Sequence, residues 1–297
     1  MRLLLTGSAG RIGRAIHAAA IGQHAVVGLD RSPFSTTTLI GDVADPELLK
    51  RALDGVDAVI HTASLHAPHV GLASEAEFHR VNVQGVQTLV ELARQAGVQR
   101  LVYTSTTALY GAAVDGQRCH WIDEEVAPQP TTVYHRSKLA AEQVLAEAAD
   151  DRLAVRVVRM SRCFPEPVDR MAAYRLHRGI DVRDVADAHL AALAATGAPF
   201  QRCIASGATP FTREDLEGLW QVPEQVLARR CPALVADFAA RGWSLPGHID
   251  RVYDAAAAWR LWGWRSRHGH DEVIAQADRR SLEVLPWQPG FADRTTE

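Results

Sequence analysis

A tyrosine and a lysine stand four positions apart at the start of a strongly helical stretch. Tyr134 and Lys138 open a run of good helix formers that continues through Leu145. Residues four apart lie on one face of a helix, about one turn from each other. An ammonium beside a phenol favours the phenolate and lowers the pKa of the phenol from about 10 toward neutrality, which makes the tyrosine a usable general acid and base. An exposed surface pair without a chemical role is the alternative.

Hydroxyl side chains cluster at the end of an apolar run that precedes this pair. Residues 104–107 read Thr-Ser-Thr-Thr and follow the apolar residues 101–103. A hydroxyl at the end of a buried strand needs a hydrogen-bond partner, and a substrate oxygen would serve. The cluster is therefore a candidate for substrate contact.

A glycine-spaced turn follows the first apolar run of the chain. Gly7, Gly10 and Gly13 give the spacing G-x-x-G-x-x-G between residues 2–6 and a run of helix formers that ends at residue 20. Glycines let the backbone touch a pyrophosphate, and the helix offers free N–H groups and its positive dipole end. Asp30 ends the next apolar run, 17 positions after Gly13. This is close to the roughly 20 expected for an acid that binds a ribose hydroxyl. The alternative is a tight turn without a ligand.

Two further loops follow predicted strands. Asp42 is placed to accept a hydrogen bond from an adenine amino group; the alternative is a helix N-cap, for which Asp45 is better placed. Residues 61–64 are mostly small and let a cofactor lie against the chain, and His66 is a candidate substrate contact or a solvated loop residue. His61, His66 and His69 also raise the question of zinc, but no Asp, Glu or Cys joins them locally and a dinucleotide site needs no metal. Asn82, inside a long predicted helix, is expected to bond a neighbouring loop.

Strand and helix patterns alternate through the first two thirds of the chain. Such alternation indicates an α/β fold of the Rossmann type, a doubly wound parallel sheet that binds ligands at the carboxyl ends of its strands. The predicted strands are 2–6, 25–29, 38–40, 57–61, 100–105 and 153–159. The predicted helices are 11–20, 46–53, 75–96, 131–149 and 184–196.

Composition excludes several kinds of partner. The chain has 297 residues, a net charge of −3 and 23% charged residues, so nucleic acid and anionic lipid are not expected as main partners. No apolar stretch reaches 18 residues, so no membrane span is expected. The four cysteines lie far apart and are interpreted as reduced thiols of a cytoplasmic protein.

These features together resemble the extended short-chain dehydrogenase/reductase superfamily, also described as NAD-dependent epimerases and dehydratases. The resemblance rests on Thr6–Gly13, Thr104–Gly111 and Tyr134–Lys138, in order over residues 1–160. It implies that Thr106 is the catalytic hydroxyl, that Tyr134 is the acid/base, and that Lys138 binds the nicotinamide ribose. Asp30 implies NAD rather than NADP, although Arg31 leaves some tolerance for NADP. The residues expected at the cofactor are Gly7, Gly10, Arg11, Ile12, Gly13, Asp30, Arg31, Asp42, Val43, Thr62, Ala63, Ser64, Tyr134 and Lys138.

The region after residue 160 limits the range of substrates that we expect. Residues 1–160 are expected to form the NAD-binding domain and 161–297 a small mixed substrate-side lobe, with 181–204 returning to the main sheet. Only about twenty residues separate Met160 from Asp181, which is short for a nucleotide-diphosphate pocket. Residues 159–171 are similar to the substrate loop of uronate dehydrogenases, which implies that Arg170 clamps a carboxylate; a solvated loop arginine is the alternative. Thr107, Ala108 and Arg162 depart from that pattern and put uronate itself in doubt.

The expected substrate contacts are His66, Thr107, Arg162, Cys163 and Arg170, with no metal. The predicted function is transfer of a hydride from a small sugar, sugar acid or other hydroxy compound to NAD. One alternative is a sugar epimerase or dehydratase with tightly bound NAD, and a second is a non-catalytic NAD-binding redox sensor. The resemblance also implies a homodimer through the helices 75–96 and 131–149. Thr212 and Asp215 predict a capping box, and residues after Trp287 are expected to be loosely held.

Overall fold

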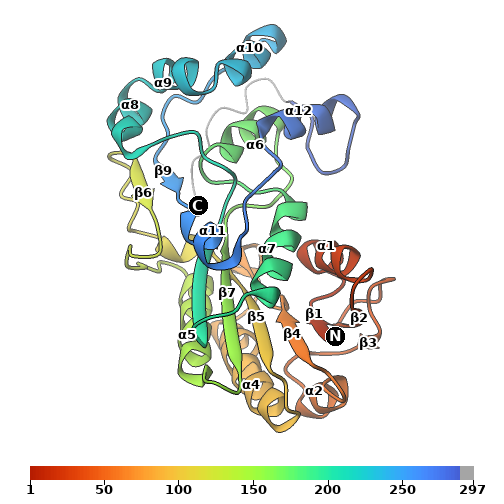
Figure 1. The fold of residues 1–297 in the computed structure, drawn as a ribbon. Helices are drawn as coiled ribbons and strands as arrows, with labels where there is room; N and C mark the ends of the chain where they lie inside the picture. The colour runs from red at the N-terminus through yellow and green to blue at the C-terminus, as the bar shows by residue number, and fades with distance from the viewer. Residues whose placement is uncertain (288–297) are drawn as a thin grey trace.

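Seven parallel strands form the central sheet of the computed structural model, which describes residues 1–287 (Figure 1). Their spatial order is β3–β2–β1–β4–β5–β7–β8. From β1 the chain adds β2 and then β3 on one side. From β4 it adds β5, β7 and β8 on the other side, so the direction of winding reverses between β1 and β4. This reversal is the switch point of a doubly wound fold, and it confirms the predicted fold class. The strands are β1 Arg2–Thr6, β2 Ala25–Asp30, β3 Leu39–Ile40, β4 Ala58–His61, β5 Arg100–Thr106, β7 Ala154–Met160 and β8 Phe200–Ala205.

The predicted strands are present with bounds that agree within one residue at each end. The strand β8 is not among the predictions, because Gln201 and Arg202 interrupt its apolar pattern. Its pairing with β7 runs from Val155 opposite Phe200 to Met160 opposite Ala205. That pairing extends the sheet beyond β7 and covers what would otherwise be an open edge.

Side chains of one strand alternate between two hydrophobic layers. Leu4 packs into the layer with α2 (Pro46–Ala52), α4 (Gly85–Gln95) and α5 (Val133–Ala148). Leu3 and Leu5 point to the other face and pack with α1 (Arg11–Ala20), α7 (Val182–Ala194) and α11 (Ala256–Trp262). This follows from the period of two in a strand. Both faces of the sheet are thus covered by helices, as the parallel pairing requires.

The predicted helix 75–96 is interrupted, which corrects the expectation of one continuous α-helix. It consists of α3 (Glu75–His79), a π-helical turn η2 (Arg80–Gln84) and α4. Asn82 lies in the π-helical turn, where its side-chain oxygen accepts from the Leu65 N–H and its amide donates to the Leu65 carbonyl and to Ser137 Oγ, at 2.8–2.9 Å. The expected bond between Asn82 and a neighbouring loop is therefore confirmed, and the irregular turn aims this side chain at two partners.

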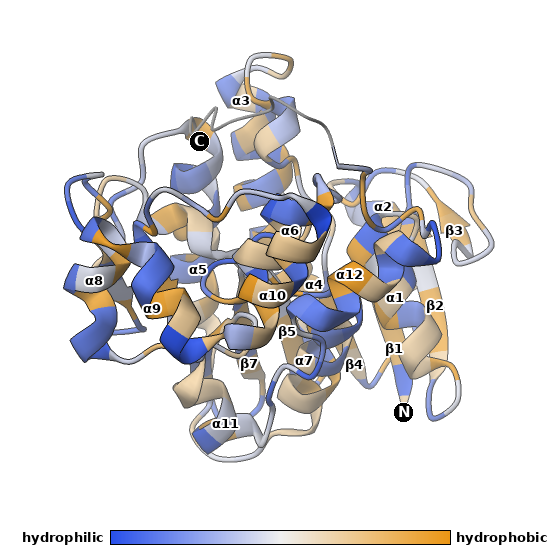
Figure 2. Cartoon of the chain, turned by 90° about the horizontal axis from the view of Figure 1, so that it is seen from above, coloured by the Kyte–Doolittle hydropathy of each residue, from blue (hydrophilic) through white to orange (hydrophobic). Residues whose placement is uncertain are grey.

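The remaining elements form a lobe at the edge where the strands of the sheet end (Figure 1). Its short parallel pair joins β6 (His120–Ile122) to β9 (Arg251–Tyr253). The expected capping box is present: Asp215 accepts from the Thr212 N–H at 2.9 Å. Figure 2 looks down on this lobe and shows α6, α8, α9, α10 and α12 spread over the sheet. The helices are α6 Val168–Arg175, α8 Leu216–Gln221, α9 Pro223–Arg230, α10 Pro232–Arg241 and α12 His270–Asp278, and the single turns are η1 Ala67–His69, η3 Thr107–Tyr110 and η4 Arg213–Asp215.

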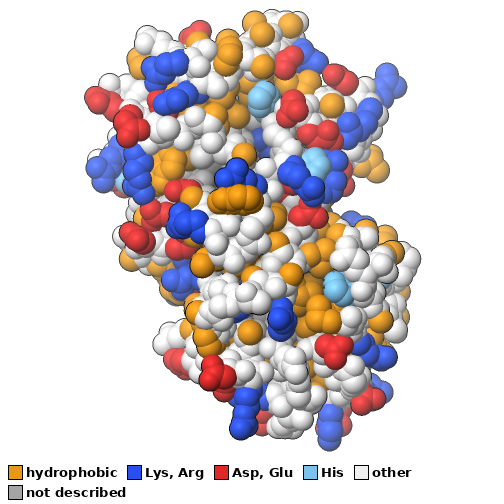
Figure 3. Space-filling model, in the orientation of Figure 1, with side chains coloured by type: hydrophobic (Ala, Val, Ile, Leu, Met, Phe, Trp, Pro, Cys, Tyr) orange, Lys and Arg blue, Asp and Glu red, His pale blue; other side chains and the backbone are white. Residues whose placement is uncertain are grey.

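Positive and negative side chains are interspersed on the face drawn in Figure 3. This pattern accords with the small net charge of −3. None of the helices within residues 1–287 is long and apolar enough to cross a membrane. The expectation about residues after Trp287 concerns a segment that lies outside the described residues.

Candidate functional site

The predicted catalytic residues come together at the end of β5. The N-cap Thr132 starts α5 by accepting from the His135 N–H, and the first turns of the helix then lie against β5. Tyr134 hydrogen-bonds Thr106. The ammonium of Lys138 donates to the Thr104 carbonyl at 2.7 Å and lies 4.3 Å from the ring centre of Tyr103. Tyr134, Lys138 and Thr106 thus form one cluster, as their spacing predicts.

The electrostatics of this cluster differ from the expectation. Burial raises the pKa of Tyr134 to about 12, although the hydrogen bond with Thr106 acts in the opposite direction. Burial also lowers the pKa of Lys138 to about 7, against the opposing charge of Glu142. The predicted lowering of the Tyr134 pKa toward neutrality is therefore wrong for this structure. Removing both groups from water disfavours their charged forms, and this raises the pKa of Tyr134 and lowers that of Lys138.

The glycine turn is packed too tightly for side chains. Gly7 has φ +72°, and a Cβ there would lie 2.5 Å from Thr62 Oγ1 and 2.7 Å from the Ala63 nitrogen. A Cβ on Gly13 would lie 2.0 Å from the Gly7 carbonyl oxygen. Thr62 Oγ1 donates to the Thr6 carbonyl at 2.8 Å and so ties the loop after β4 to this turn. The turn and the loop after β4 therefore form one continuous backbone surface.

The N-terminus of α1 is suited to an anion. Gly10 is its N-cap and makes no side-chain capping bond, and the first turn, which includes Arg11, Ile12 and Gly13, holds no acidic residue. The N–H groups and the positive dipole end of this ten-residue helix can thus face a phosphate. These features fit the pyrophosphate of a dinucleotide.

Two acids stand at the ends of the neighbouring strands. Asp30 accepts from the Ala9 N–H at 3.0 Å and from the Ser32 N–H at 2.9 Å, so it ties the glycine turn to the end of β2. Asp42 accepts from the Ala44 N–H at 2.9 Å and pairs with Arg80 at 2.7 Å. Burial alone would raise the pKa of Asp42, but these two partners lower it. Both carboxylates are held in place and retain lone pairs for further donors.

Two other predicted cofactor residues, Val43 and Arg31, differ in their exposure to solvent. Val43 packs in the hydrophobic core and is 5% exposed, so only its backbone can serve a cofactor. Arg31 is exposed. The predicted contact residues Ala63 and Ser64 are half-buried in the loop that follows β4.

The loops after β4 and β7 meet beside Lys138. The rings of His66 and Phe164 stack with centres 6.3 Å apart, and the guanidinium of Arg162 lies 5.6 Å from the ring centre of Phe164. Burial lowers the pKa of His66 to about 4, with further contributions from His69 and Lys138. The contribution of Lys138 to this shift indicates that His66 lies near the cluster of Tyr134, Thr106 and Lys138. Phe164 is a residue that the sequence analysis does not single out, since a lone aromatic in a loop carries no spacing signal.

The predicted substrate residues after β7 have protein partners. Glu166 receives two hydrogen bonds from Arg162, at 2.7 and 2.9 Å. The Cys163 thiol is buried in the core and its pKa is raised by burial to about 11, so a substrate contact is open to its backbone rather than to its sulfur. Thr107 is 4% exposed in η3. Arg170 is half-buried and lies in the first turn of α6, whereas the sequence predicts that it lies in a loop.

The hydroxyl cluster of β5 is largely satisfied by the protein. Thr104 Oγ1 bonds His189 Nε2 at 2.7 Å, and Ser105 Oγ donates to Glu142 at 2.5 Å. The idea that a substrate oxygen satisfies these hydroxyls therefore does not apply to Thr104 and Ser105. It remains open for Thr106, which also receives a bond from the Ala108 N–H at 3.0 Å.

Arg11 links the glycine turn to two distant segments. Its Nε donates to the Cys163 carbonyl at 3.1 Å, and its guanidinium pairs with Glu283. The Leu285 N–H in turn donates to the Glu166 carbonyl at 2.9 Å. Glu283 has no signal in the local sequence, because its partner is far away along the chain.

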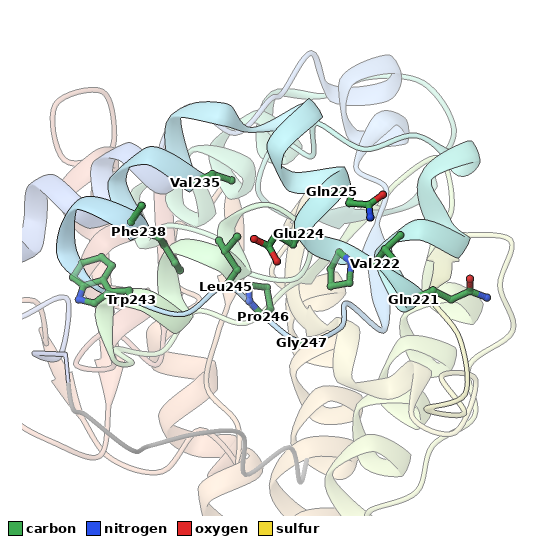
Figure 4. A pocket seen from close by; sticks show the side chains of 12 residues that line it. Gln221, Val222, Glu224, Gln225, Val235, Phe238, Trp243, Leu245, Pro246 and Gly247 are labelled. Atoms are coloured by element: carbon green, nitrogen blue, oxygen red, sulfur yellow. The ribbon is translucent and has the colours of Figure 1, made fainter.

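Other grooves lie apart from this cluster. One of about 550 Å³ opens in the lobe between α9, α10 and residues 243–247, and Figure 4 shows Phe238, Trp243 and Leu245 along it. None of the predicted catalytic, cofactor or substrate residues lines that groove. Within residues 1–287, no three His, Cys, Asp or Glu side chains are grouped to hold a metal ion.

The sequence of this chain is similar to one protein family and to several known proteins. A family model described as the NAD dependent epimerase/dehydratase family matches residues 3–173. The chain is 32% identical over 170 residues to a 4-hydroxy-2-methyl-3-oxo-4-farnesyl-3,4-dihydroquinoline-1-oxide ketoreductase of Stigmatella aurantiaca, covering 54% of this chain and 49% of that protein. It is 31% identical over 170 residues to an N-acetyl-alpha-D-glucosaminyl-diphospho-ditrans,octacis-undecaprenol 4-epimerase of Escherichia coli O157:H7, covering 55% and 49%. The match thus spans about half the length of these curated relatives.

Solved structures share the fold over nearly the whole chain. MoeE5 in complex with UDP-glucose and NAD superposes with a TM-score of 0.69 at 24% identity, over 95% of this chain and 100% of that one. A UDP-glucose 4-epimerase of Thermus thermophilus in complex with NAD gives 0.67 at 24% identity, over 94% and 98%. At this level of identity the likeness establishes a common fold.

Proposed function

The chain belongs to the NAD-dependent epimerase/dehydratase family, and on that premise we propose that it is an NAD-dependent oxidoreductase. The proposed substrate is a small sugar, sugar acid such as a uronate, or other hydroxy compound. The observation that carries the proposal is the cluster of Tyr134, Thr106 and Lys138 at the end of β5. This cluster joins an acid/base pair to a hydroxyl at the edge of the sheet where a doubly wound fold binds its ligands.

The proposed chemistry is oxidation of an alcohol carbon. Tyr134 takes the proton of the substrate hydroxyl in its phenolate form, which burial makes a minor form near pH 7, and Thr106 hydrogen-bonds the same oxygen. When bound, NAD supplies the acceptor for the hydride that leaves the carbon. Lys138 holds the ribose hydroxyls and stabilises the phenolate charge that burial disfavours. One hydride and one proton leave the substrate, and a carbonyl remains.

The proposed cofactor contacts follow the strand ends. The N-terminus of α1 and the turn of Gly7, Gly10 and Gly13 would hold the pyrophosphate, in a cradle that a Cβ would fill at Gly7 and Gly13. Asp30 would accept from the adenosine ribose and Asp42 from the adenine amino group. The backbone of Arg11, Ile12 and Val43 and the loop Thr62, Ala63 and Ser64 would complete the contacts, and Arg31 beside the ribose would allow some NADP.

The size of the loop after β7 supports a small substrate. It leaves β7 at Met160 and reaches α7 at Val182 with only α6 between. His66, Thr107, Arg162 and Arg170 are the proposed contacts, with Arg162 already paired to Glu166. The Stigmatella relative is named a ketoreductase of a quinoline oxide. Its name supports redox chemistry on a substrate without a nucleotide.

Epimerase or dehydratase chemistry is the second candidate. The family description and the name of the Escherichia coli relative favour it. In that case the hydride returns to the substrate and NAD stays bound. A non-catalytic redox sensor is a third reading, which the Tyr134–Lys138 pair disfavours. The proposed setting is cytoplasmic, with a homodimer formed through α4 and α5.

The deciding experiment is absorbance at the band of reduced nicotinamide. Purified protein is mixed with NAD and a panel of uronic acids, aldoses and small alcohols. Growth of NADH with one compound supports the dehydrogenase and names its substrate class. No growth, with NAD already bound to the protein as purified, supports the epimerase or dehydratase. Neither signal favours the sensor.

A further inference from the structure

Three successive turns of α5 contact the last three residues of β5. Tyr134 bonds Thr106, Lys138 Nζ donates to the Thr104 carbonyl at 2.7 Å, and Glu142 accepts from Ser105 Oγ at 2.5 Å. Residues spaced by four share one helix face, so this face presents a phenol, an ammonium and a carboxylate in a row. Two of the three belong to the proposed catalytic cluster. The third, Glu142, has no role in it so far.

Glu142 is held by a second buried charge. Its side chain is 1% exposed, and that of Arg159 on β7 is 0% exposed. Arg159 donates to both carboxylate oxygens, with Nη2 at 2.6 Å from one and Nε at 3.0 Å from the other. Arg159 Nη1 also donates to the hydroxyl of Tyr110 at 3.1 Å. A buried carboxylate with this many partners keeps its position.

The end of β5 is clamped from both faces of the sheet. On the face of α5, Glu142 binds Ser105. On the opposite face, Thr104 Oγ1 bonds His189 Nε2 at 2.7 Å, while His189 Nδ1 bonds the Val185 carbonyl at 2.7 Å. Thr106 directly follows the clamped residues. The bonds to Thr104 and Ser105 therefore fix the backbone that carries the Thr106 hydroxyl.

We propose that Glu142, held by Arg159, is a positioning residue for the catalytic pair of Tyr134 and Lys138. It fixes Ser105 and thereby the adjacent Thr106, and it sets a buried negative charge one helical turn from Lys138. The inference rests on the proposed function, because it assigns Glu142 a task toward the residues named there.

The titratable neighbours of Lys138 support the proposed electrostatic role of Glu142. The charge of Lys138 reaches His61 and His66, and their pKa values, lowered mainly by burial to about 3 and about 4, leave both histidines neutral near pH 7. Tyr103 lies under the ammonium on β5, and burial raises its pKa, so it is neutral as well. Tyr134 is neutral for the same reason. Among the described groups that act on Lys138, Glu142 is the anion, and it opposes the lowering of the Lys138 pKa.

The composition of the chain offers a direct test. Its sequence contains only two lysines, Lys50 and Lys138. Protein labelled with ¹³C at the lysine ε-carbon therefore gives two signals, and the exposed Lys50 serves as the internal reference. A pH titration of the full-length protein by NMR then reads the midpoint of Lys138 without any need for turnover.

The expected results separate charge from packing. In Glu142→Gln the Lys138 midpoint falls by about one pH unit, because an opposing charge nearby is removed. In Glu142→Asp the midpoint stays near the wild-type value. In Ser105→Ala the midpoint is unchanged, since the carboxylate remains, but kcat falls about tenfold with unchanged affinity for NAD, because Thr106 loses its support.

Two outcomes overturn the inference: a wild-type midpoint in folded Glu142→Gln, or a wild-type kcat in Ser105→Ala. If Glu142→Gln does not fold, Ser105→Ala, which keeps the buried ion pair intact, decides the question by its kcat. A Tyr134→Phe variant that retains full turnover would overturn the proposed function instead. The midpoint in Glu142→Gln still reports on Glu142 in that case, so the two failures are distinguishable.

Discussion

Acidification below pH 6.5 should destabilise this protein steeply, because three histidines are buried in the neutral form. Burial lowers the pKa of His61 to about 3, that of His177 to about 3 and that of His189 to about 4. In the unfolded chain each histidine has an ordinary pKa near 6.5. Between pH 6.5 and about 4 the unfolded state therefore binds up to three more protons at these histidines than the folded state does. The free energy of unfolding is full above pH 6.5 and falls as the pH drops.

The size of the effect follows from these values. One pH unit below 6.5, each neutral buried histidine costs about 1.4 kcal/mol, so the three together remove about 4 kcal/mol of stability. For a chain of this size that corresponds to a fall in Tm of roughly 10 °C. His66, with its pKa lowered to about 4, adds to the loss in the same window. Shifted groups other than histidine act in other windows. Lys138, with its pKa lowered to about 7, adds stability only as the pH rises from 7 toward 10.5. Asp181 and Asp250, with pKa values of about 2, lose their contribution only below about pH 4.

Calorimetric melts at pH 7.5, 6.5 and 5.5, at constant ionic strength, measure this prediction. The matched variant is His177→Gln, whose side-chain amide can still donate to the Arg251 carbonyl that His177 contacts at 2.9 Å. Its loss of Tm between pH 6.5 and 5.5 should be about two thirds to three quarters of the wild-type loss, because His61, His189 and the less buried His66 remain. A wild-type Tm that changes by less than about 2 °C over this interval would refute the reasoning, because at least two of the histidines would then be protonated in the folded protein.

Three further predictions concern the site. Tyr134→Phe should lower kcat by about 10²–10⁴ while NAD affinity changes little, measured by NADH absorbance and calorimetric titration; near-normal turnover contradicts the assignment. Gly7→Ala places a Cβ 2.5 Å from Thr62 Oγ1 at φ +72° and should weaken NAD binding at least tenfold, whereas Gly22→Ala, with open space around its Cβ, should leave binding unchanged. Equal affinities for the two variants would contradict this explanation. Asn82→Ala leaves buried groups of the loop at Leu65 unpaired and should cost about 2–3 kcal/mol in urea unfolding, and a cost below about 0.5 kcal/mol would show that water replaces the amide.

Elements with strong local periodicity are predictable from the sequence. The strand at residues 2–6 and the helix at 11–20 match their predicted bounds, because the apolar run and the glycine spacing are local signals. Interruption of the helix 75–96 by a π-helical turn is not predictable in this way. It depends on Asn82 reaching Leu65 and Ser137, which lie 17 and 55 positions away.

Some features of the candidate site are likewise predictable from the sequence, and others are not. The spacing of Tyr134 and Lys138 places them on one helix face, and the glycine spacing predicts the tight turn at the start of α1, so residue types and spacing alone determine both. The tertiary structure decides the rest: burial reverses the expected direction of the Tyr134 pKa, Arg159 and Ser105 converge on Glu142, and Phe164 meets His66 across two loops. The physical reason is that helix period and turn geometry act between near neighbours, whereas desolvation and contact between loops depend on how distant segments pack.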